Sequence, residues 1–176
     1  MFFCYVDDRV FLGQDDDEID KAINDLRKLK CDLEEIGDIE DHIGVNFERK
    51  EDGCVKLTQP HLTQQIIDEV KTSTRLATKH APAAPSKILR RYEKEPKFNG
   101  RFHYRRIIGK LNFLEKGTRP DIAYAVHQCA RFCEDPKVSH GQAVEHVVRC
   151  LAATKNEGLT LNPKNQSFEM CVDSDF

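Results

Sequence analysis

The chain has 176 residues, of which 39% are hydrophobic and 32% charged, and its formal net charge is −3. This balance provides enough apolar side chains for a folded core and excludes a disordered chain. No apolar run approaches the roughly 20 residues that a membrane helix needs, and MFFCYV is too short for a signal peptide. We therefore expect an intracellular protein without membrane contact.

Charge is unevenly distributed along the chain. Residues 1–52 hold 7 Lys and Arg against 17 Asp and Glu, a balance of −10, whereas residues 86–119 hold 11 against 3, a balance of +8. An acidic piece and a basic piece suggest cation chemistry at one end and contact with a polyanion at the other. The alternative is that both are solvated faces of helices.

The first predicted element is a β-hairpin. Aromatic and β-branched residues over Phe2–Val6 and Arg9–Leu12 are typical of strands, and only Asp7 and Asp8 separate them. Taken alone, an Asp–Asp pair at such a place is a good turn former and nothing more.

A capped amphipathic helix is predicted to follow. The run Asp15–Asp17 leads into Glu18, where the positive end of a helix dipole favours negative charge. We therefore interpret these aspartates as a helix cap. The apolar face consists of Ile19, Ala22, Ile23, Leu26 and Leu29.

A second hairpin is predicted over Ile43–Glu48 and Cys54–Leu57, with Asp52 and Gly53 in its turn. Pro60 then opens a helix. The stretch TSTRLATKHAPAAPSK is rich in Thr, Ala and Pro, and its prolines block helix continuation, so we expect an extended linker.

Beyond the linker the pattern predicts helices. Residues 101–116 place Tyr104, Ile107, Ile108, Leu111 and Leu114 on one face. Thr118 with Asp121, and Ser139 with Gln142, have the spacing of capping boxes that open two further helices. Gly158 ends the last helix, and strand-like runs follow at Leu159–Leu161 and Phe168–Val172.

Four stretches of the sequence resemble the copia-type retrotransposon polymerase. YVDD at residues 5–8 resembles the catalytic hairpin of reverse transcriptases. LTQPHLTQQIIDEV from Leu57, YRRIIGKLNFLEKGTRPDIAYAVHQCARFCEDP from Tyr104, and the following AVEHVVRCLAATKNEGLTL resemble blocks that occur in that family in the same order. The resemblance covers essentially the whole chain.

The resemblance implies an α+β fold in four parts. Residues 1–58 would be a C-terminal palm fragment with the YVDD hairpin and a primer-grip-like hairpin. Residues 59–85 would be a thumb-like helix and a Pro/Ala linker, and residues 86–157 a basic helical thumb or connection. Residues 158–176 would begin a ribonuclease H-like domain.

The resemblance also assigns the catalytic site. It implies that Asp7 and Asp8 are catalytic and hold Mg²⁺ or Mn²⁺, and hard carboxylate oxygens suit the two-metal clamp of phosphoryl transfer. Arg9 departs from the apolar residue expected after YVDD, and its guanidinium would compete with metal for these carboxylates. Asp173 matches the first metal-binding aspartate of ribonuclease H, in a site that is incomplete without further carboxylates.

Nucleic-acid contacts are implied at two further places. Ile43 and Gly44 correspond to the primer grip, where a glycine permits close approach of a backbone; a plain turn glycine is the alternative. The basic residues suit phosphate contact, which is independent of sequence and sensitive to salt. They are Lys87, Arg90, Arg91, Arg101, Arg105, Arg106, Lys110 and Lys116. Arg119 is expected to cap or bridge helices instead.

The implied function is therefore RNA-directed DNA synthesis, with an RNA template, a DNA primer or product and the rest of the polyprotein as partners. The family further implies a cytoplasmic particle and the nucleus. Because family members also use an aspartate on an earlier palm strand and a fingers region, we expect a fragment that is inactive alone. Its lone first hairpin would be marginal in water.

Two alternatives come from other classes. One is a non-catalytic nucleic-acid-binding remnant that uses the basic helical half. The other is a zinc site, since the pairs Cys129/Cys133 and His140/His146 lie near metal-ligand spacing. Seven scattered cysteines in apolar contexts favour reduced, mostly buried thiols over both zinc and a disulfide scaffold.

Overall fold

A computed structural model describes residues 2–5, 8–11, 15–31, 33–35, 37–70, 79–84 and 88–162. The chain divides into two compact units, Met1–His42 and Ile43–Phe176. Each unit contains helix and strand, which agrees with the α+β class expected from the sequence. Within the described ranges, no helix is both long enough and apolar enough to cross a membrane.

The first unit begins with the predicted hairpin. Strand β1 (Phe2–Tyr5) pairs antiparallel with β2 (Asp8–Phe11), and Tyr5 is the register partner of Asp8. The hairpin is thus confirmed, but its connection is displaced by one residue, because Asp8 belongs to β2. Residues 6 and 7 lie outside the described part of the chain.

The cap of helix α1 (Asp16–Lys28) is also confirmed. The Asp15 carboxylate accepts a hydrogen bond of 2.9 Å from the Glu18 backbone N–H, which satisfies one of the unpaired donors of the first turn. The apolar face is only partly covered, since Ile23 is buried whereas Leu29 is 74% exposed. The two-residue strand β3 (Asp41–His42) ends this unit.

The second unit contains a three-stranded antiparallel arrangement of β4 (Val45–Arg49), β5 (Val55–Thr58) and β6 (Leu159–Leu161). The β4–β5 hairpin is confirmed, with Gly53 at φ 83° in its turn. Strand β6 pairs with β5, placing Leu159 opposite Leu57 and Leu161 opposite Val55. The run at 159–161 is therefore a strand, and its partner lies about a hundred residues earlier.

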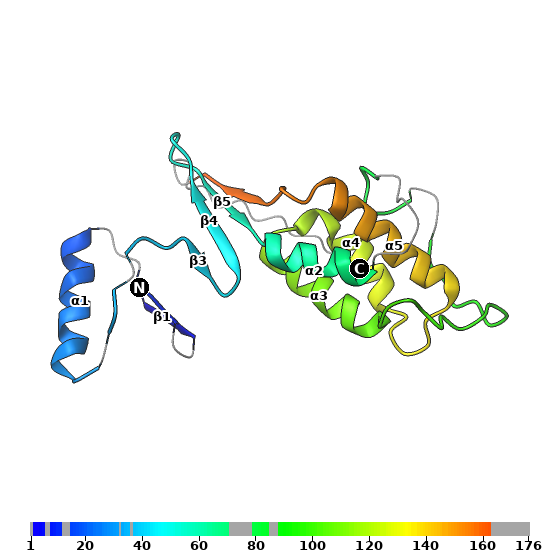
Figure 1. Ribbon diagram of the computed structural model, residues 1–176, viewed down its shortest axis with the longest axis horizontal. Coiled ribbons are helices and arrows are strands. Elements are labelled where there is room, and N and C mark those ends of the chain that lie inside the picture. Colours follow the sequence, from blue (N-terminus) through cyan, green and yellow to red (C-terminus); the bar gives the residue numbers. More distant parts are fainter. Residues whose placement is uncertain are drawn as a thin grey trace, which may run out of the picture. The chain divides into compact units, whose positions relative to one another are not determined.

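The helices of the second unit are α2 (Pro60–Val70), α3 (Tyr104–Gly117), α4 (Ala123–Ala130) and α5 (Val138–Ala153), and a 3₁₀ turn, η1 (Pro120–Ile122), precedes α4. Helices α2 and α4 each contact both α3 and α5, so the four form one cluster (Figure 1). The predicted face of α3 is entirely buried. It packs with Ile66 of α2, Val126 of α4 and Val147 of α5 in one core.

Both predicted capping boxes are wrong, for a tertiary reason. The Thr118 hydroxyl donates to the Gln59 side-chain oxygen at 3.1 Å instead of capping the N-terminus of the following helical segment. Ser139 lies inside α5, and its backbone N–H and hydroxyl donate to Glu95 at 2.8 and 2.6 Å. Distant partners thus compete for hydroxyls that the local pattern assigns to caps.

Candidate functional site

The acidic hairpin is described in part. Asp7 and Asp173 lie outside the described residues, and for Asp8 the backbone alone is described, at the start of β2. Arg9 is exposed on β2, with Cys4 as its register partner. The expected metal site at Asp7 and Asp8 therefore stays a prediction from the sequence. Elsewhere in the described chain, no cluster of three or more His, Cys, Asp or Glu side chains could hold a metal.

The turn before β4 has an unusual backbone. Ile43 and Gly44 both have positive φ, 52° and 72°. A β-branched residue rarely adopts this left-handed region, so the Ile43 backbone is strained, and its side chain is 39% exposed. Gly44 lies in the turn, and apart from its chain neighbours no atom lies within 4 Å of the place where its Cβ would stand, so the primer-grip interpretation stays a prediction. The space beside Gly44 is therefore open.

Two of the candidate nucleic-acid-binding cations are engaged within the protein. Arg106 and Lys110, one turn apart on α3, both pair with Glu69 of α2, and the Lys110 Nζ lies 2.8 Å from its carboxylate. The hydrogen bond from Lys110 is the main cause that lowers the pKa of Glu69. These cations join α3 to α2, which reduces their availability for phosphate.

The other basic candidates differ among themselves. The Arg101 Nη1 lies 3.9 Å from the Glu145 carboxylate, a loose pair in which the Arg101 side chain is exposed. Lys87 lies outside the described residues. The remaining side chains are exposed and form no ion pair with the described part of the chain; they are Arg90, Arg91, Arg105 and Lys116.

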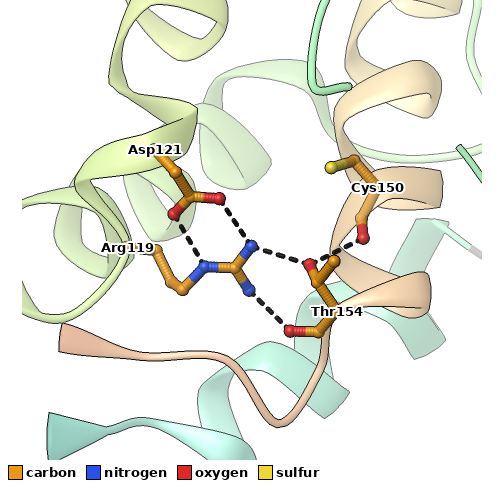
Figure 2. A network of polar contacts seen from close by, with 4 residues as sticks. All are labelled: Arg119, Asp121, Cys150 and Thr154. Carbon is orange, nitrogen blue, oxygen red and sulfur yellow. Dashed lines mark hydrogen bonds and ion pairs between the residues drawn. The ribbon is translucent and has the colours of Figure 1, made fainter. Parts of the chain in front are cut away.

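Arg119 bridges helices, as expected. Its side chain is 2% exposed, and its Nε and Nη2 donate to the two oxygens of Asp121, each at 2.8 Å (Figure 2). Nη1 and Nη2 also donate to the backbone oxygen and the hydroxyl of Thr154 at 2.9 and 2.7 Å, at the end of α5. The guanidinium lowers the pKa of Asp121. This cation is structural and cannot reach a ligand.

The zinc alternative fails because its histidines have other partners. The Lys137 backbone N–H donates to His140 Nδ1 at 2.9 Å, so His140 Nε2 carries the proton that it donates to the Arg90 carbonyl at 2.9 Å. His146 Nε2 lies 3.0 Å from the Ala81 carbonyl. Burial raises the pKa of the Cys129 thiol to about 12, which opposes the thiolate that zinc requires.

The described cysteines are thiols, and none forms a disulfide with another described cysteine. Cys54, Cys129 and Cys150 are buried and Cys133 is half-buried, whereas Cys4 and Cys31 are exposed. The expectation of buried thiols therefore holds in the second unit and not in the first.

The sequence analysis missed the partner of the α3 cations and a pair on α4. Glu69 flanks the apolar face of α2, and no local signal shows that residues 106 and 110 meet it. Buried Glu115 of α3 lies 2.8 Å from the Nε2 of His127, which is itself 61% exposed. The only sequence signal for this pair was the position of Glu115 on the otherwise apolar face of α3.

Comparison with known proteins places the chain among transposon proteins. No family model and no solved structure matches it. It is 30% identical to the retrovirus-related Pol polyprotein from transposon RE1 of Arabidopsis thaliana over 165 residues, which are 92% of this chain and 11% of that protein. It is 26% identical to the corresponding polyprotein from transposon TNT 1-94 of Nicotiana tabacum over 180 residues, 99% of this chain and 14% of that protein.

A third relative is shorter. The chain is 27% identical over 153 residues to a putative transposon Ty5-1 protein of Saccharomyces cerevisiae, covering 86% of this chain and 48% of that protein. The chain thus spans between about a tenth and about half of the length of these relatives. It is related, over most of its residues, to one segment of the retrovirus-related Pol polyproteins of copia-type transposons.

Proposed function

We propose that the chain is a segment of a retrotransposon reverse transcriptase, an RNA-directed DNA polymerase that works by two-metal nucleotidyl transfer. The observation that carries this proposal is the similarity to transposon Pol polyproteins over at least 86% of the chain. The antiparallel hairpin whose strands flank residues 6 and 7 supports it, since carboxylates beside a tight strand connection suit metal-dependent chemistry.

In this proposal Asp7 and Asp8 hold Mg²⁺ or Mn²⁺ beside the primer terminus. Bound divalent metal would activate the primer 3′ hydroxyl and stabilise charge on the leaving phosphate. The carboxylates fix the cations at the hairpin, and without a cation they repel each other. Asp173 would serve the ribonuclease H-like part in the same way, together with carboxylates from beyond this chain.

Metal binding can be measured without polymerisation. We expect Mn²⁺ to broaden the NMR signals of β1 and β2 residues in the full chain, and Asp7→Asn with Asp8→Asn to abolish the broadening. Asp20→Asn on exposed α1 is the matched control, because it removes a carboxylate from the same unit without touching the hairpin. Broadening that survives the paired substitution would refute the metal assignment.

We further infer that these 176 residues do not extend a primer by themselves. One adjacent carboxylate pair offers few of the oxygen ligands that two octahedral cations need. A primer-extension assay on an RNA template with Mg²⁺ or Mn²⁺ should show no incorporation. Incorporation that Asp7→Asn eliminates would contradict this inference while supporting the polymerase assignment.

Contacts to template and primer would involve Ile43, Gly44 and the exposed cations. The open space beside Gly44 and the strain at Ile43 suit a contact point, because strained backbone is concentrated at functional sites. Arg105 is a better phosphate ligand than Arg106, since Glu69 pairs with Arg106. The Arg101, Arg106 and Lys110 assignments are correspondingly weaker than those of Arg90, Arg91, Arg105 and Lys116.

The exposed cations also favour a second candidate, a non-catalytic nucleic-acid-binding remnant. Filter binding to an RNA–DNA hybrid across a salt series distinguishes the two. Arg105→Gln should reduce the salt slope by about 1, whereas Arg106→Gln should change it less. Binding that does not depend on divalent metal and is unchanged by Asp7→Asn would favour the non-catalytic remnant. Absence of binding near 50 mM salt would argue against the remnant.

A further inference from the structure

A cavity of about 600 Å³ lies in the second unit, between helices α4 and α5 and the irregular chain at residues 79–84 and 88–89. Buried Leu89, Ala125 and Val147 are among its apolar lining. Tyr124 and Ile88 also line it, and they are 67% and 64% exposed. The volume lies in the range of sites that hold one small molecule. None of the candidate residues discussed above as catalytic or phosphate-binding lines this cavity.

Helix α5 also contributes four polar side chains to the cavity lining. Gln142, Glu145, His146 and Arg149 recur at helical spacing and all line the cavity. His146 is engaged by the Ala81 carbonyl, and Glu145 lies beside Arg101. The Arg149 Nε is different, because it is buried and has no hydrogen-bond partner in the described structure. A buried donor without an acceptor is unfavourable, and an anion bound by the Arg149 guanidinium would offset part of that cost.

Charge and shape restrict the ligand. Lys79 and Arg149 are the cations of the lining, and its one carboxylate, Glu145, is offset by Arg101, so an anion is favoured. Gln128 and Gln142 offer carboxamides, which both donate and accept hydrogen bonds, as the edge of a nucleobase requires. The exposed ring of Tyr124 offers a flat face for stacking.

We propose that this cavity binds a nucleotide. The base stacks on Tyr124 and is read by Gln128 or Gln142, and the phosphate is bound by Arg149 and Lys79. An acidic peptide would satisfy the cations but would not use a flat aromatic face together with two carboxamides, and 600 Å³ is too small for a peptide helix about 10 Å across. The nucleotide is either free or the unpaired end of a strand, since both present a base and a phosphate.

The test is titration of the full chain with AMP, followed by NMR chemical shifts of α4 and α5. Tyr124→Ala should weaken binding at least about five-fold, the loss expected for one base–aromatic stack. Phe113→Ala is the matched control, because Phe113 is an exposed aromatic on α3 that does not line the cavity. Lys79→Gln should weaken AMP binding and leave adenosine binding unchanged.

A second arm uses hexa-adenylate RNA. Tyr124-dependent binding of both ligands supports a free nucleotide, and Tyr124-dependent binding of the RNA alone supports a strand end. The proposal is overturned if neither ligand binds, if Tyr124→Ala leaves both affinities unchanged, or if inorganic phosphate binds as well as AMP. It is also overturned if an Asp-rich hexapeptide shifts these residues and the nucleotides do not. Asp7→Asn should not affect any of these titrations, which separates this result from the polymerase proposal.

Discussion

The two units of the chain differ most in what they bury. In the second unit, side chains from α2, α3, η1, α4 and α5 form one apolar core, and Ile107, Leu111 and Leu114 are fully buried in it. Among the described residues of the first unit, Ile23 alone is buried. The helical cluster therefore carries its own stability, whereas the acidic hairpin and α1 do not.

The candidate catalytic residues and the apolar core therefore lie in different units of the chain. The candidate carboxylates lie at a two-stranded hairpin, a structure that is marginal in water without further packing. The apolar face of α1 is likewise only partly covered, because Leu29 at its end is exposed. The described part of the first unit therefore has little core of its own, in contrast to the second unit.

The largest expected effect tests this contrast with one substitution at two places. Leu111→Ala should lower the free energy of unfolding of the second unit by about 3–5 kcal/mol, because it leaves a cavity in a closed core. Leu29→Ala is the matched control in the first unit. It should change the free energy of unfolding of that unit by less than about 0.5 kcal/mol, since this side chain is 74% exposed. Urea unfolding followed by far-UV circular dichroism measures both. Equal losses would mean that the units do not differ in packing.

A smaller effect concerns acid stability in the second unit. The hydrogen bond that Arg119 donates to Asp121 keeps the pKa of Asp121 below the ordinary value of 3.8. A carboxyl with a depressed pKa in the folded state contributes stability above its unfolded-state pKa and loses it as the pH falls through the folded-state pKa. The Tm should therefore decrease as the pH is lowered below about 4. Asp121→Asn should make this decrease smaller.

The control for the acid experiment is Asp20→Asn in α1. It should leave the Tm profile of the second unit unchanged, because Asp20 is exposed and belongs to the first unit. If Asp121→Asn and the parent chain lose the same Tm between pH 5 and pH 2, the Arg119 pair does not contribute to acid stability. Glu69, whose pKa is also lowered, would then be the next carboxyl to replace.

At the turn before β4, relief of strain should stabilise the chain. Ile43→Asn keeps the left-handed backbone but suits it better, since Asn followed by Gly is preferred where two successive residues have positive φ. We expect a gain of about 1 kcal/mol, measured by hydrogen exchange of β4 amides. If the variant also binds primer–template less tightly, Ile43 is retained for contact; unchanged binding would leave it a turn residue only.

An effect of similar size is expected at the cap of α1. Asp15→Ala removes the acceptor of the Glu18 N–H and should destabilise the helix by about 1 kcal/mol. Hydrogen exchange of the first turn should rise, with no change in α3 or α5. Asp16→Ala is the comparison, because it removes a first-turn charge but not the cap acceptor and should therefore destabilise the helix less than Asp15→Ala does. Faster exchange throughout the chain would show that the two units unfold together.

Local patterns predicted the elements that local physics decides. The buried face of α3 follows from 3.6-residue periodicity, and the Asp15 cap and the Gly53 turn from short-range hydrogen bonding. The capping boxes at Thr118 and Ser139 failed because Gln59 and Glu95, 59 and 44 residues away, bind their side chains. Spacing along the chain cannot reveal such competitors.

The candidate site divides in the same way. Bridging by Arg119 was predictable from the adjacent Pro and Asp, although its Thr154 partner was not. Charge density indicated a basic surface, but not that Glu69 engages Arg106 and Lys110. The cavity beside Tyr124 had no sequence signal, because its walls come from three separate stretches that meet through the core.

The pairing of β5 with β6 has a consequence for how this segment fits into a longer protein. The described chain enters the second unit at β4 and reaches Leu161 on β6, in strands that share β5 as their neighbour. Gly158 permits this closure, since a Cβ there would collide with the Leu57 carbonyl oxygen. The chain therefore enters the helical cluster from β5 and returns from it to β6, so the two connections of the cluster lie side by side in one small sheet. In a longer protein, an insertion or replacement within the cluster would leave the path of the chain on either side unchanged as long as β5 and β6 remain paired.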